Sequence, residues 1–371
     1  MQATHRTFVI LTSLLAAFVV YSLIAPAATA CTGITIKPKD GSVIRARSME
    51  FGLAPADLII IPRGAALSGD DGSKIGLKWK AKYGVIGANM VGLTIVTDGL
   101  NEKGLSGGTF MFNNGYAVYP KVAQEDEGKV LASGDVVTYV LSNCATVSEA
   151  VETIKTAAVR DCIFKDWGYA PQFHYLFTDA GGHCAVIEYT AGGMKVYDNP
   201  LGVITNSPPF DWQLINLNNY INLSVFNPAP IKFDGVTLTE PSAGGGMLGL
   251  PGDFGAPSRF IRAVTFSQTA LPVQTADEGV LQAFHILNLF DIPKGAIREK
   301  MPDGKMMAEF TDWTSAADVT NLRFYIRTYT NSRIRMLDLT RCNIASGNPV
   351  IIKLDQKEIY EDLTPSVHNT H

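Results

Sequence analysis

Apolar and polar residues alternate along several short runs of this chain, in the manner of strands that bury one face. The first such run, "CTGITIKP", begins at Cys31, and "KDG" supplies a turn behind it. The pattern resumes in "SVIRARSMEF", which ends at Phe51. Two alternating runs joined by a short turn predict a β-hairpin.

The register of this hairpin decides which side chains meet. A tight turn at residues 40–41 would pair Cys31 with Glu50, and Arg47 would then lie on the opposite face, because successive side chains alternate along a strand. Under that register, Arg47 and Glu50 can both reach Cys31 only if the second strand bulges or ends near residues 48–49.

Further strand patterns come in hairpin-like groups rather than singly between helices. They lie within residues 83–100, 174–190, 193–206 and 321–341. Helical patterns lie between them, at Gly134 to Leu141, Val147 to Ala158, Trp212 to Leu223 and Ala276 to Phe290. Grouped strands favour an α+β fold with antiparallel sheets.

The domain organisation is simple. The Gly/Pro-rich residues 240–257 predict a loop. The sequence shows no internal repeat, no low-complexity segment and no convincing domain boundary, so residues 31–371 are expected to form a single domain.

Residues 1–30 have the layout of a secretory signal peptide. Arg6 precedes an apolar stretch over residues 8–24, and Ala28 and Ala30 provide an A-x-A cleavage site. An uncleaved anchor is one alternative, because the stretch is almost long enough to span a bilayer. A lipoprotein route, with acylation of the next residue, is another. We expect removal of the leader and an exported protein, periplasmic or secreted, with no stable membrane insertion afterwards.

Bulk composition narrows the class of protein. The 371 residues are 46% hydrophobic and 18% charged, which suits a globular protein with a large core. The formal net charge is −4 and no basic run is present. Nucleic-acid binding therefore has little electrostatic support.

The other cysteines are Cys144, Cys162, Cys184 and Cys342. An oxidising compartment would permit one or two disulfides among these four residues, and their pairing is open. Small buried residues without a special role are an equal alternative. Their spacing matches no zinc pattern.

Cleavage after Ala30 would make Cys31 the N-terminal residue. An α-amino group has an unperturbed pKa of roughly 7.7 to 8.0, so it can act as the base for the adjacent thiol. The Arg47 guanidinium would favour the thiolate, and the Glu50 carboxylate could hold the amine. A solvated ion pair is the alternative interpretation of Arg47 and Glu50.

Five segments, in order along the chain, resemble the choloylglycine hydrolase family. They are "CTGITIKPKDGSVIRARSMEFG", "DGLNEKGL", "GVITNSPPFDWQLINLNNY", "GLPGDFGAPSRFIRA" and "FHILNLFDIPKGAIRE". The resemblance implies the N-terminal nucleophile (Ntn) hydrolase fold, an αββα sandwich of two antiparallel sheets between helical layers. It also implies hydrolysis of linear amides by a cysteine. Bile salt hydrolases, penicillin V acylases and exported acylases of N-acyl homoserine lactones are members.

The resemblance also implies roles for particular residues. Cys31 would be the nucleophile and, through its freed amine, the base, while Arg47 would steady its thiolate. Glu50 stands where aspartate is more common, and Asn206 matches an asparagine whose amide donates to the oxyanion. Arg259 would complete the charged cluster. A turn residue is the alternative for Asn206, and a surface salt bridge for Arg259.

The second oxyanion donor would be the backbone N–H of Met111. Asparagine or tyrosine is usual at this position in the family, so methionine removes a clue to the substrate. Asn101, in the "NEKG" turn, is expected to be structural. The family needs no metal or organic cofactor, and similar members are commonly homotetramers.

The substrate stays open at this stage. The family recognises an apolar acyl group, and Phe51, Met90, Phe110, Met111 and Phe112 lie near the expected site, although plain core positions are the alternative for all five. Penicillin V, an acyl homoserine lactone or a conjugated bile acid would each suit. A non-catalytic exported or membrane-anchored binding protein on the same scaffold is the alternative function.

Overall fold

The structure is a computed structural model that describes residues 30–364, except residues 53, 70–75, 165–166 and 301–303. The predicted signal peptide, apart from Ala30, lies outside the described residues. Within the described part of the chain, no helix has both the length and the apolar character needed to cross a bilayer.

Two antiparallel sheets form the body of the molecule. The five-stranded sheet contains, in spatial order, β1 (Ala30–Ile36), β2 (Ile44–Glu50), β18 (Thr311–Asp318), β19 (Arg323–Thr328) and β20 (Asn331–Asp338). The eight-stranded sheet runs β13 (Gly193–Asp198), β12 (Cys184–Thr190), β11 (Phe173–Asp179), β8 (Leu105–Met111), β7 (Val96–Asn101), β6 (Val85–Asn89), β3 (Leu58–Ile61) and β21 (Val350–Ile352).

Short two-stranded pairs decorate these sheets. They are β4 (Ala66–Ser68) with β5 (Lys78–Lys80), β9 (Val130–Ala132) with β10 (Ala158–Arg160), β14 (Ile231–Phe233) with β15 (Val236–Leu238), and β16 (Ile297–Lys300) with β17 (Met306–Glu309). Only the β9 and β10 pair is parallel among the strands described.

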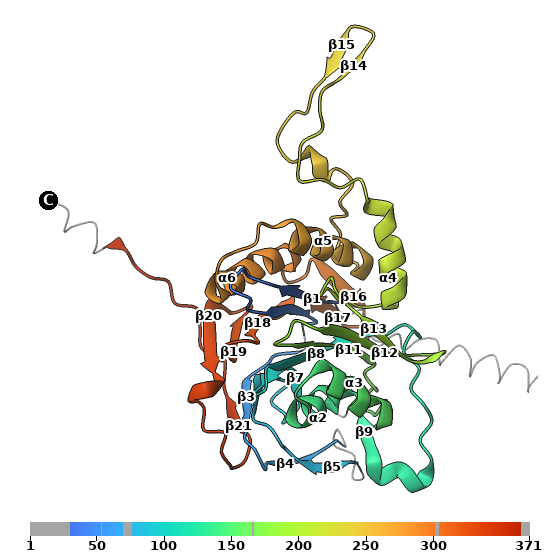
Figure 1. Cartoon of the computed structure of the whole chain (residues 1–371), viewed down its shortest axis with the longest axis vertical. Helices are drawn as coiled ribbons and strands as arrows, with labels where there is room; N and C mark the ends of the chain where they lie inside the picture. The colour runs from blue at the N-terminus through green and yellow to red at the C-terminus, as the bar shows by residue number, and fades with distance from the viewer. Residues whose placement is uncertain (1–29, 53, 70–75, 165–166, 301–303, 365–371) are drawn as a thin grey trace, which may run out of the picture.

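Helices cover the outer face of each sheet. Helices α5 (Ala256–Thr269) and α6 (Ala276–Leu287) pack on β1, β2 and β18, whereas α2 (Val136–Asn143) and α3 (Val147–Thr156) pack on β7, β8, β11 and β12. The sheets face each other through β1 against β8 and β18 against β7. Figure 1 shows the resulting order of helix, sheet, sheet and helix. This arrangement confirms the expected α+β sandwich.

The helix predictions hold apart from shifts of a few residues at helix ends and one omission. The helix expected at Trp212–Leu223 is α4, which begins earlier at Phe210 and ends at Leu217, followed by a 3-10 turn. Helix α5 was not predicted, and its first two residues fall inside the predicted loop 240–257. Pro257 is tolerated there because the first turn of a helix needs no intrahelical N–H donor.

The first hairpin forms, but its predicted register is wrong by one residue. Cys31 pairs with Met49, Gly33 with Arg47, and Ala30 with Glu50. Arg47 therefore lies on the same face as Cys31, and Glu50 lies on the other face.

The expected bulge in the second strand is also wrong. Strand β2 pairs regularly with β1 as far as Glu50. The irregularity lies in the neighbouring strand β18, between Thr311 and Trp313. The bulge thus lies beside β2, on the strand that pairs with its far edge.

A long arm between α4 and α5 carries the β14–β15 hairpin away from the body (Figure 1). Its large apolar side chains are exposed, with Phe226 79% and Phe233 61% accessible. The others are Ile221, Val225, Ile231, Val236, Leu238 and Leu248.

The five cysteines are all described residues, and no disulfide joins any two of them.

Candidate active site

Cys31 is fully buried near the start of β1. Its Sγ lies 3.7 Å from Met49 Sδ, and Arg47 Nη2 lies 3.6 Å from the same Met49 sulfur. Three side chains on one face of the hairpin therefore gather between the two sheets. Burial raises the pKa of the Cys31 thiol, while the Arg47 and Arg259 charges and the Met111 N–H act in the opposite direction.

Arg47 is fully buried without a carboxylate in salt-bridge contact among the described residues. Its Nη1 donates to the Thr109 carbonyl at 2.5 Å, and its Nε donates to the Ser48 carbonyl at 3.3 Å. The guanidinium carbon lies 4.4 Å from the ring centre of Phe110 and 5.1 Å from that of Trp313. Neutral carbonyls and aromatic faces hold the cation in place and leave its charge uncompensated.

Asn206 and Arg259 hold the other side of Cys31. The backbone N–H of Cys31 donates to Asn206 Oδ1 at 2.7 Å, and Arg259 Nη2 donates to the same oxygen at 2.7 Å. Arg259 Nη1 also donates to the Cys31 carbonyl. Two pure donors on Oδ1 fix the orientation of the amide, so Nδ2 must be the donor towards Met111 O, at 2.9 Å.

A close approach of two segments brings Asn206 to Cys31. Gly33 and Ile204 exchange backbone hydrogen bonds at 2.8 and 3.1 Å. A Cβ on Gly33 would lie 2.8 Å from both the Ile204 and the Phe110 side chains, a distance that real Cβ atoms do not show. Glycine at this position therefore permits the contact.

A buried histidine supports the same segment. His174 lies between Glu188 Oε1 at 2.9 Å and the Thr205 carbonyl at 3.0 Å, and it stacks on Phe112 with ring centres 4.6 Å apart. The contact with Thr205 fixes the residue just before Asn206. This positioning pair was missed from the sequence, where an isolated histidine carries no signal for such a role.

Glu50 lies on the opposite face of β2 from Cys31, towards α5. It is fully buried, with the Ser48 hydroxyl close to its carboxylate. Burial raises its pKa to about 7 against the opposing charges of Arg259 and Arg47. Glu50 therefore acts on Cys31 through the electrostatic field, and the thiol pKa includes that effect.

Two cavities lie near Cys31 and share Met111 in their walls. A small apolar cavity of about 20 Å³ is lined by Cys31 itself. It is lined by Cys31, Met49, Phe51, Ala54, Asn89, Met90, Thr97, Thr109, Met111, Trp167, Phe173 and Trp313. Of the five apolar residues expected near the site, Phe51, Met90 and Met111 line it, whereas Phe110 packs on Arg47 and Phe112 on His174.

A larger and more open cavity of about 430 Å³ lies beside the opposite end of this site. Much of its surface is apolar, and we call it the polar cavity for the amide, hydroxyl and charged side chains in its wall. It is lined by Ala30, Met111, Asn113, Asn114, Asn206, Ser207, Asp253, Phe254, Gly255, Ala256, Arg259, Ile297 and Glu309. Ala30 lies in this wall, so the backbone nitrogen of Cys31 is one peptide bond from the cavity. The buried Glu309 was not predicted from the sequence, because its position in β17 gives it no distinguishing pattern.

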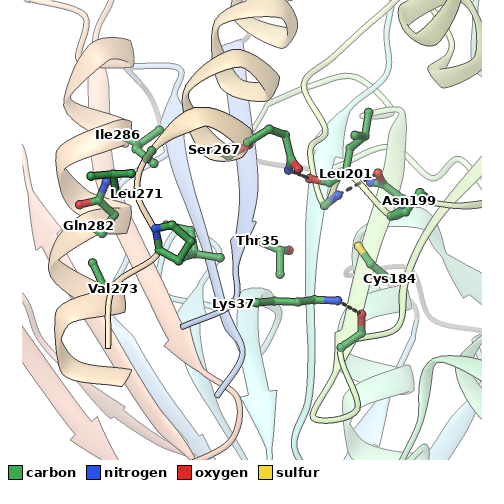
Figure 2. A pocket seen from close by; sticks show the side chains of 17 residues that line it. Thr35, Lys37, Cys184, Asn199, Leu201, Ser267, Leu271, Val273, Gln282 and Ile286 are labelled. Atoms are coloured by element: carbon green, nitrogen blue, oxygen red, sulfur yellow. Dashed lines mark hydrogen bonds between the residues drawn. The ribbon is translucent and has the colours of Figure 1, made fainter. Parts of the chain in front are cut away.

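A third cavity, of about 250 Å³, lies near the far end of β1 (Figure 2). Its wall contains Thr35, Lys37 and Cys184 but none of the residues predicted for the site. Lys37 Nζ contacts the Gly182 carbonyl at 2.9 Å. Within the described residues, no group of three or more His, Cys, Asp or Glu is arranged to hold a metal.

The remaining predicted residue, Asn101, is buried at the end of β7. Its amide nitrogen donates to the Leu141 and Cys144 carbonyls, both at 2.7 Å, and its oxygen accepts from Lys103 N and Leu105 N. These bonds tie the turn after β7 to α2, as expected for a structural residue.

Comparison with known proteins places this geometry in a family. The model of linear amide C–N hydrolases of the choloylglycine hydrolase family matches residues 31–353. The chain belongs to the choloylglycine hydrolase family. Its members hydrolyse linear amides, and this chain is therefore an enzyme of the linear amide C–N hydrolase class.

Individual relatives agree with the family. The chain is 32% identical over 326 residues to a bile salt hydrolase/transferase of Clostridium perfringens, covering 86% of this chain and 95% of the relative. It is 29% identical to a penicillin V acylase of Pectobacterium atrosepticum, covering 84% of this chain and 81% of the relative.

Solved structures agree on the fold. A mutant conjugated bile acid hydrolase from Clostridium perfringens matches with a TM-score of 0.79 at 28% identity, over 90% of this chain and all of that one. A penicillin V acylase from Agrobacterium tumefaciens matches with a TM-score of 0.68 at 24% identity, over 86% of this chain and 90% of that one. Both support the Ntn-hydrolase fold of this choloylglycine hydrolase family member.

Proposed function

We propose that this enzyme is a cysteine N-terminal-nucleophile amidohydrolase that uses Cys31 to cleave an amide between an apolar acyl group and an amine. The observation that carries the proposal is the position of Cys31 between an apolar and a polar cavity, beside an arginine that forms no ion pair with a carboxylate among the described residues. An amide bond placed at the sulfur would have its acyl part on the apolar side and its amine on the polar side.

Activation would begin with removal of residues 1–30 on export. Cleavage converts the Cys31 amide nitrogen, which faces Asn206 Oδ1 at 2.7 Å, into an amine that can accept the thiol proton. Before cleavage, that nitrogen is not basic and burial keeps the thiol pKa raised. A periplasmic or secreted enzyme is therefore part of the proposal.

The chemistry follows from the groups around the sulfur. The Cys31 thiolate attacks the amide carbon, and the Arg47 charge stabilises the thiolate before attack. The oxyanion receives the second N–H of Asn206 Nδ2, whose first N–H is bound to Met111 O, together with the Met111 backbone N–H. The α-ammonium then protonates the leaving amine, and water hydrolyses the thioester with the amine as base. No step calls for a cofactor.

The acyl group would enter beside Phe51, Met90 and Met111. The apolar cavity now holds about 20 Å³, so a longer acyl chain requires displacement of lining side chains. Methionine is well suited to that, because its unbranched side chain repacks at little cost.

We also propose that the enzyme is a homo-oligomer, with the homotetramer of similar family members as the expected state. The support is the projecting arm, whose exposed apolar side chains have no partner within the described part of one chain. Contiguous exposed apolar groups mark interaction surfaces.

The test combines intact mass with a substrate panel. The exported protein should begin at an unmodified Cys31 and should release an amine from penicillin V, from a glycine- or taurine-conjugated bile acid, or from an N-acyl homoserine lactone. Cys31→Ala should abolish this activity with folding retained, whereas the control Cys342→Ala should keep it. A retained leader, an acylated cysteine or activity in Cys31→Ala would refute the mechanism and favour a binding protein.

A further inference from the structure

The polar cavity beside Cys31 is the space for the leaving amine if the proposed function holds, and this inference rests on that function. The apolar cavity is on the acyl side of the sulfur, so the nitrogen side of a bound amide faces the polar cavity. Ala30 lines the polar cavity, and its removal leaves the cavity open next to the new α-amine.

Two buried side chains in this wall have unused hydrogen-bonding capacity. Asn113 is 5% accessible and Glu309 is 1% accessible. Neither the amide atoms of Asn113 nor the carboxylate oxygens of Glu309 form a hydrogen bond with the described residues. A buried polar group without a partner destabilises a fold, so its presence in a cavity wall points to a ligand that completes it.

The other charged groups in the wall are already engaged. Arg259 uses four of its five N–H groups on Phe254 O, Cys31 O, Thr32 Oγ1 and Asn206 Oδ1. Asp253 accepts from Gly255 N at 2.8 Å and from Ser258 Oγ at 2.6 Å. Among the described residues of this wall, Glu309 is the charged group left to meet a ligand.

We propose that Glu309 and Asn113 form a leaving-amine subsite that favours amides whose amine part is neutral or cationic over amides whose amine part carries a carboxylate or sulfonate. A carboxylate accepts N–H and O–H donors and attracts a cation, whereas a second anion in the same cavity is repelled. The amide of Asn113 supplies one more acceptor and two more donors.

The test varies the amine and keeps the acyl group constant. Octanoyl amides of ethanolamine, ethylenediamine and glycine present a neutral, a cationic and an anionic leaving group. Assays at pH 8 keep Glu309 ionised, because burial and the nearby Glu299 raise its pKa only to about 7. We expect the kcat/KM of the ethanolamine amide to exceed that of the glycine amide by at least tenfold in the wild-type enzyme.

Variants of the cavity residues test whether this ratio of kcat/KM values depends on the cavity. Glu309→Gln should lower the ratio about tenfold by raising turnover of the glycine amide, and Asn113→Asp should raise it by adding a second negative charge. The control Glu152→Gln, on exposed α3, should leave it unchanged. An unchanged ratio in Glu309→Gln, or an equal loss with all three amides, would overturn the proposal.

Binding separates this inference from the proposed function. The dissociation constants of the three amides for Cys31→Ala, and for Cys31→Ala combined with Glu309→Gln, need no catalysis. In one outcome, the wild type hydrolyses none of the amides, Cys31→Ala binds the cationic and neutral amides more tightly than the anionic one, and Glu309→Gln removes this order of affinities. The subsite would then stand and the proposed function would fail. If Cys31→Ala shows no charge order, the subsite is wrong even when the wild type is active.

Discussion

Arg45 and Arg47 lie two residues apart on one face of β2, and both are fully buried. Arg45 Nη2 contacts Asp98 Oδ1 at 2.5 Å, and the other oxygen of Asp98 accepts from Ser315 Oγ at 2.7 Å. Carbonyls, aromatic rings and a thioether contact the Arg47 guanidinium. The same residue type is thus neutralised at one position and left charged at the next.

The different surroundings of Arg45 and Arg47 indicate that the two arginines have different roles. The Arg45–Asp98 pair links β2 to β7 and so joins the two sheets. Within the described part of the chain, Arg47 forms no ion pair with a carboxylate, and the neighbouring Cys31 on the same face can become an anion. In the proposed mechanism, this buried cation stabilises the Cys31 thiolate.

The largest effect should come from Arg45→Met, on stability. The substitution leaves Asp98 buried without its cation, which costs about 3 to 5 kcal/mol. Arg47→Met strands no carboxylate and should cost less than half as much. Urea unfolding of both variants measures the difference, and Arg45→Met combined with Asp98→Leu should recover much of the loss. Equal destabilisation by the two single variants would contradict the comparison.

Next in size is the effect of Arg47→Gln on activity. Loss of an opposite charge near a thiol raises its pKa by about 1 to 3 units, so kcat/KM should fall about a hundredfold or more. The pH dependence of Cys31 alkylation by iodoacetamide reports that pKa directly. Arg47→Lys, which keeps a charge without the planar guanidinium, should retain more activity than Arg47→Gln. Turnover within threefold of the wild type in Arg47→Gln would exclude the proposed role.

A third prediction concerns Glu50 and pH. Its pKa is about 7 in the fold against 4.5 ordinarily, so the folded state favours the protonated form. Stability is therefore full below about pH 4.5 and declines as the pH rises towards 7. Glu50→Gln removes this dependence, so its advantage over the wild type should grow to about 3 kcal/mol at most by pH 8. Denaturant unfolding at pH 5 and pH 8 measures this difference. An equal change in the free energy of unfolding of the two proteins between these pH values would contradict the prediction.

The smallest effect should come from Met111→Ala. In the proposed mechanism the backbone N–H of this residue serves the oxyanion, so kcat should change less than tenfold. KM should rise because the side chain lines the apolar cavity. Asn206→Ala removes a side-chain donor and should lower kcat about a hundredfold to a thousandfold. Steady-state kinetics of both variants on the same amide measure the two effects. A loss of kcat in Met111→Ala as large as that in Asn206→Ala would contradict the backbone role of Met111.

The sequence predicted the sandwich and the major helices because alternation and helical periodicity are local signals. The register of the first hairpin depends on a contact with a distant segment, so the local sequence did not predict it. Asp40 Oδ1 accepts from Ser42 N at 3.0 Å, and its Oδ2 accepts from Ala276 N at 2.8 Å, at the start of α6. The loop is thus shaped by a distant helix, and its ends pair at Ile36 and Ile44.

Most of the residues predicted for the site lie close together, whereas the residues that support them were not predicted. Cys31, Arg47, Asn206 and Arg259 come together, and Glu50 lies on the other face of the same strand. The cleavage site and the hairpin pattern pointed to Cys31, Arg47 and Glu50, whereas only the family resemblance supplied Asn206 and Arg259, because no spacing rule connects Cys31 to residues so far along the chain. His174 and Glu309 escaped notice because their significance depends on burial and on missing partners, and neither property is visible in a sequence.

The paired backbone hydrogen bonds of Gly33 and Ile204 determine when the site forms during folding. They close a loop of roughly 170 residues, and contacts of such long range form late in folding because the entropy of loop closure opposes them. Asn206 and Arg259 can surround the cysteine only after that closure. If the protein is exported as proposed, the chain that leaves the translocation channel should carry an ordinary thiol, which becomes reactive only when folding is complete.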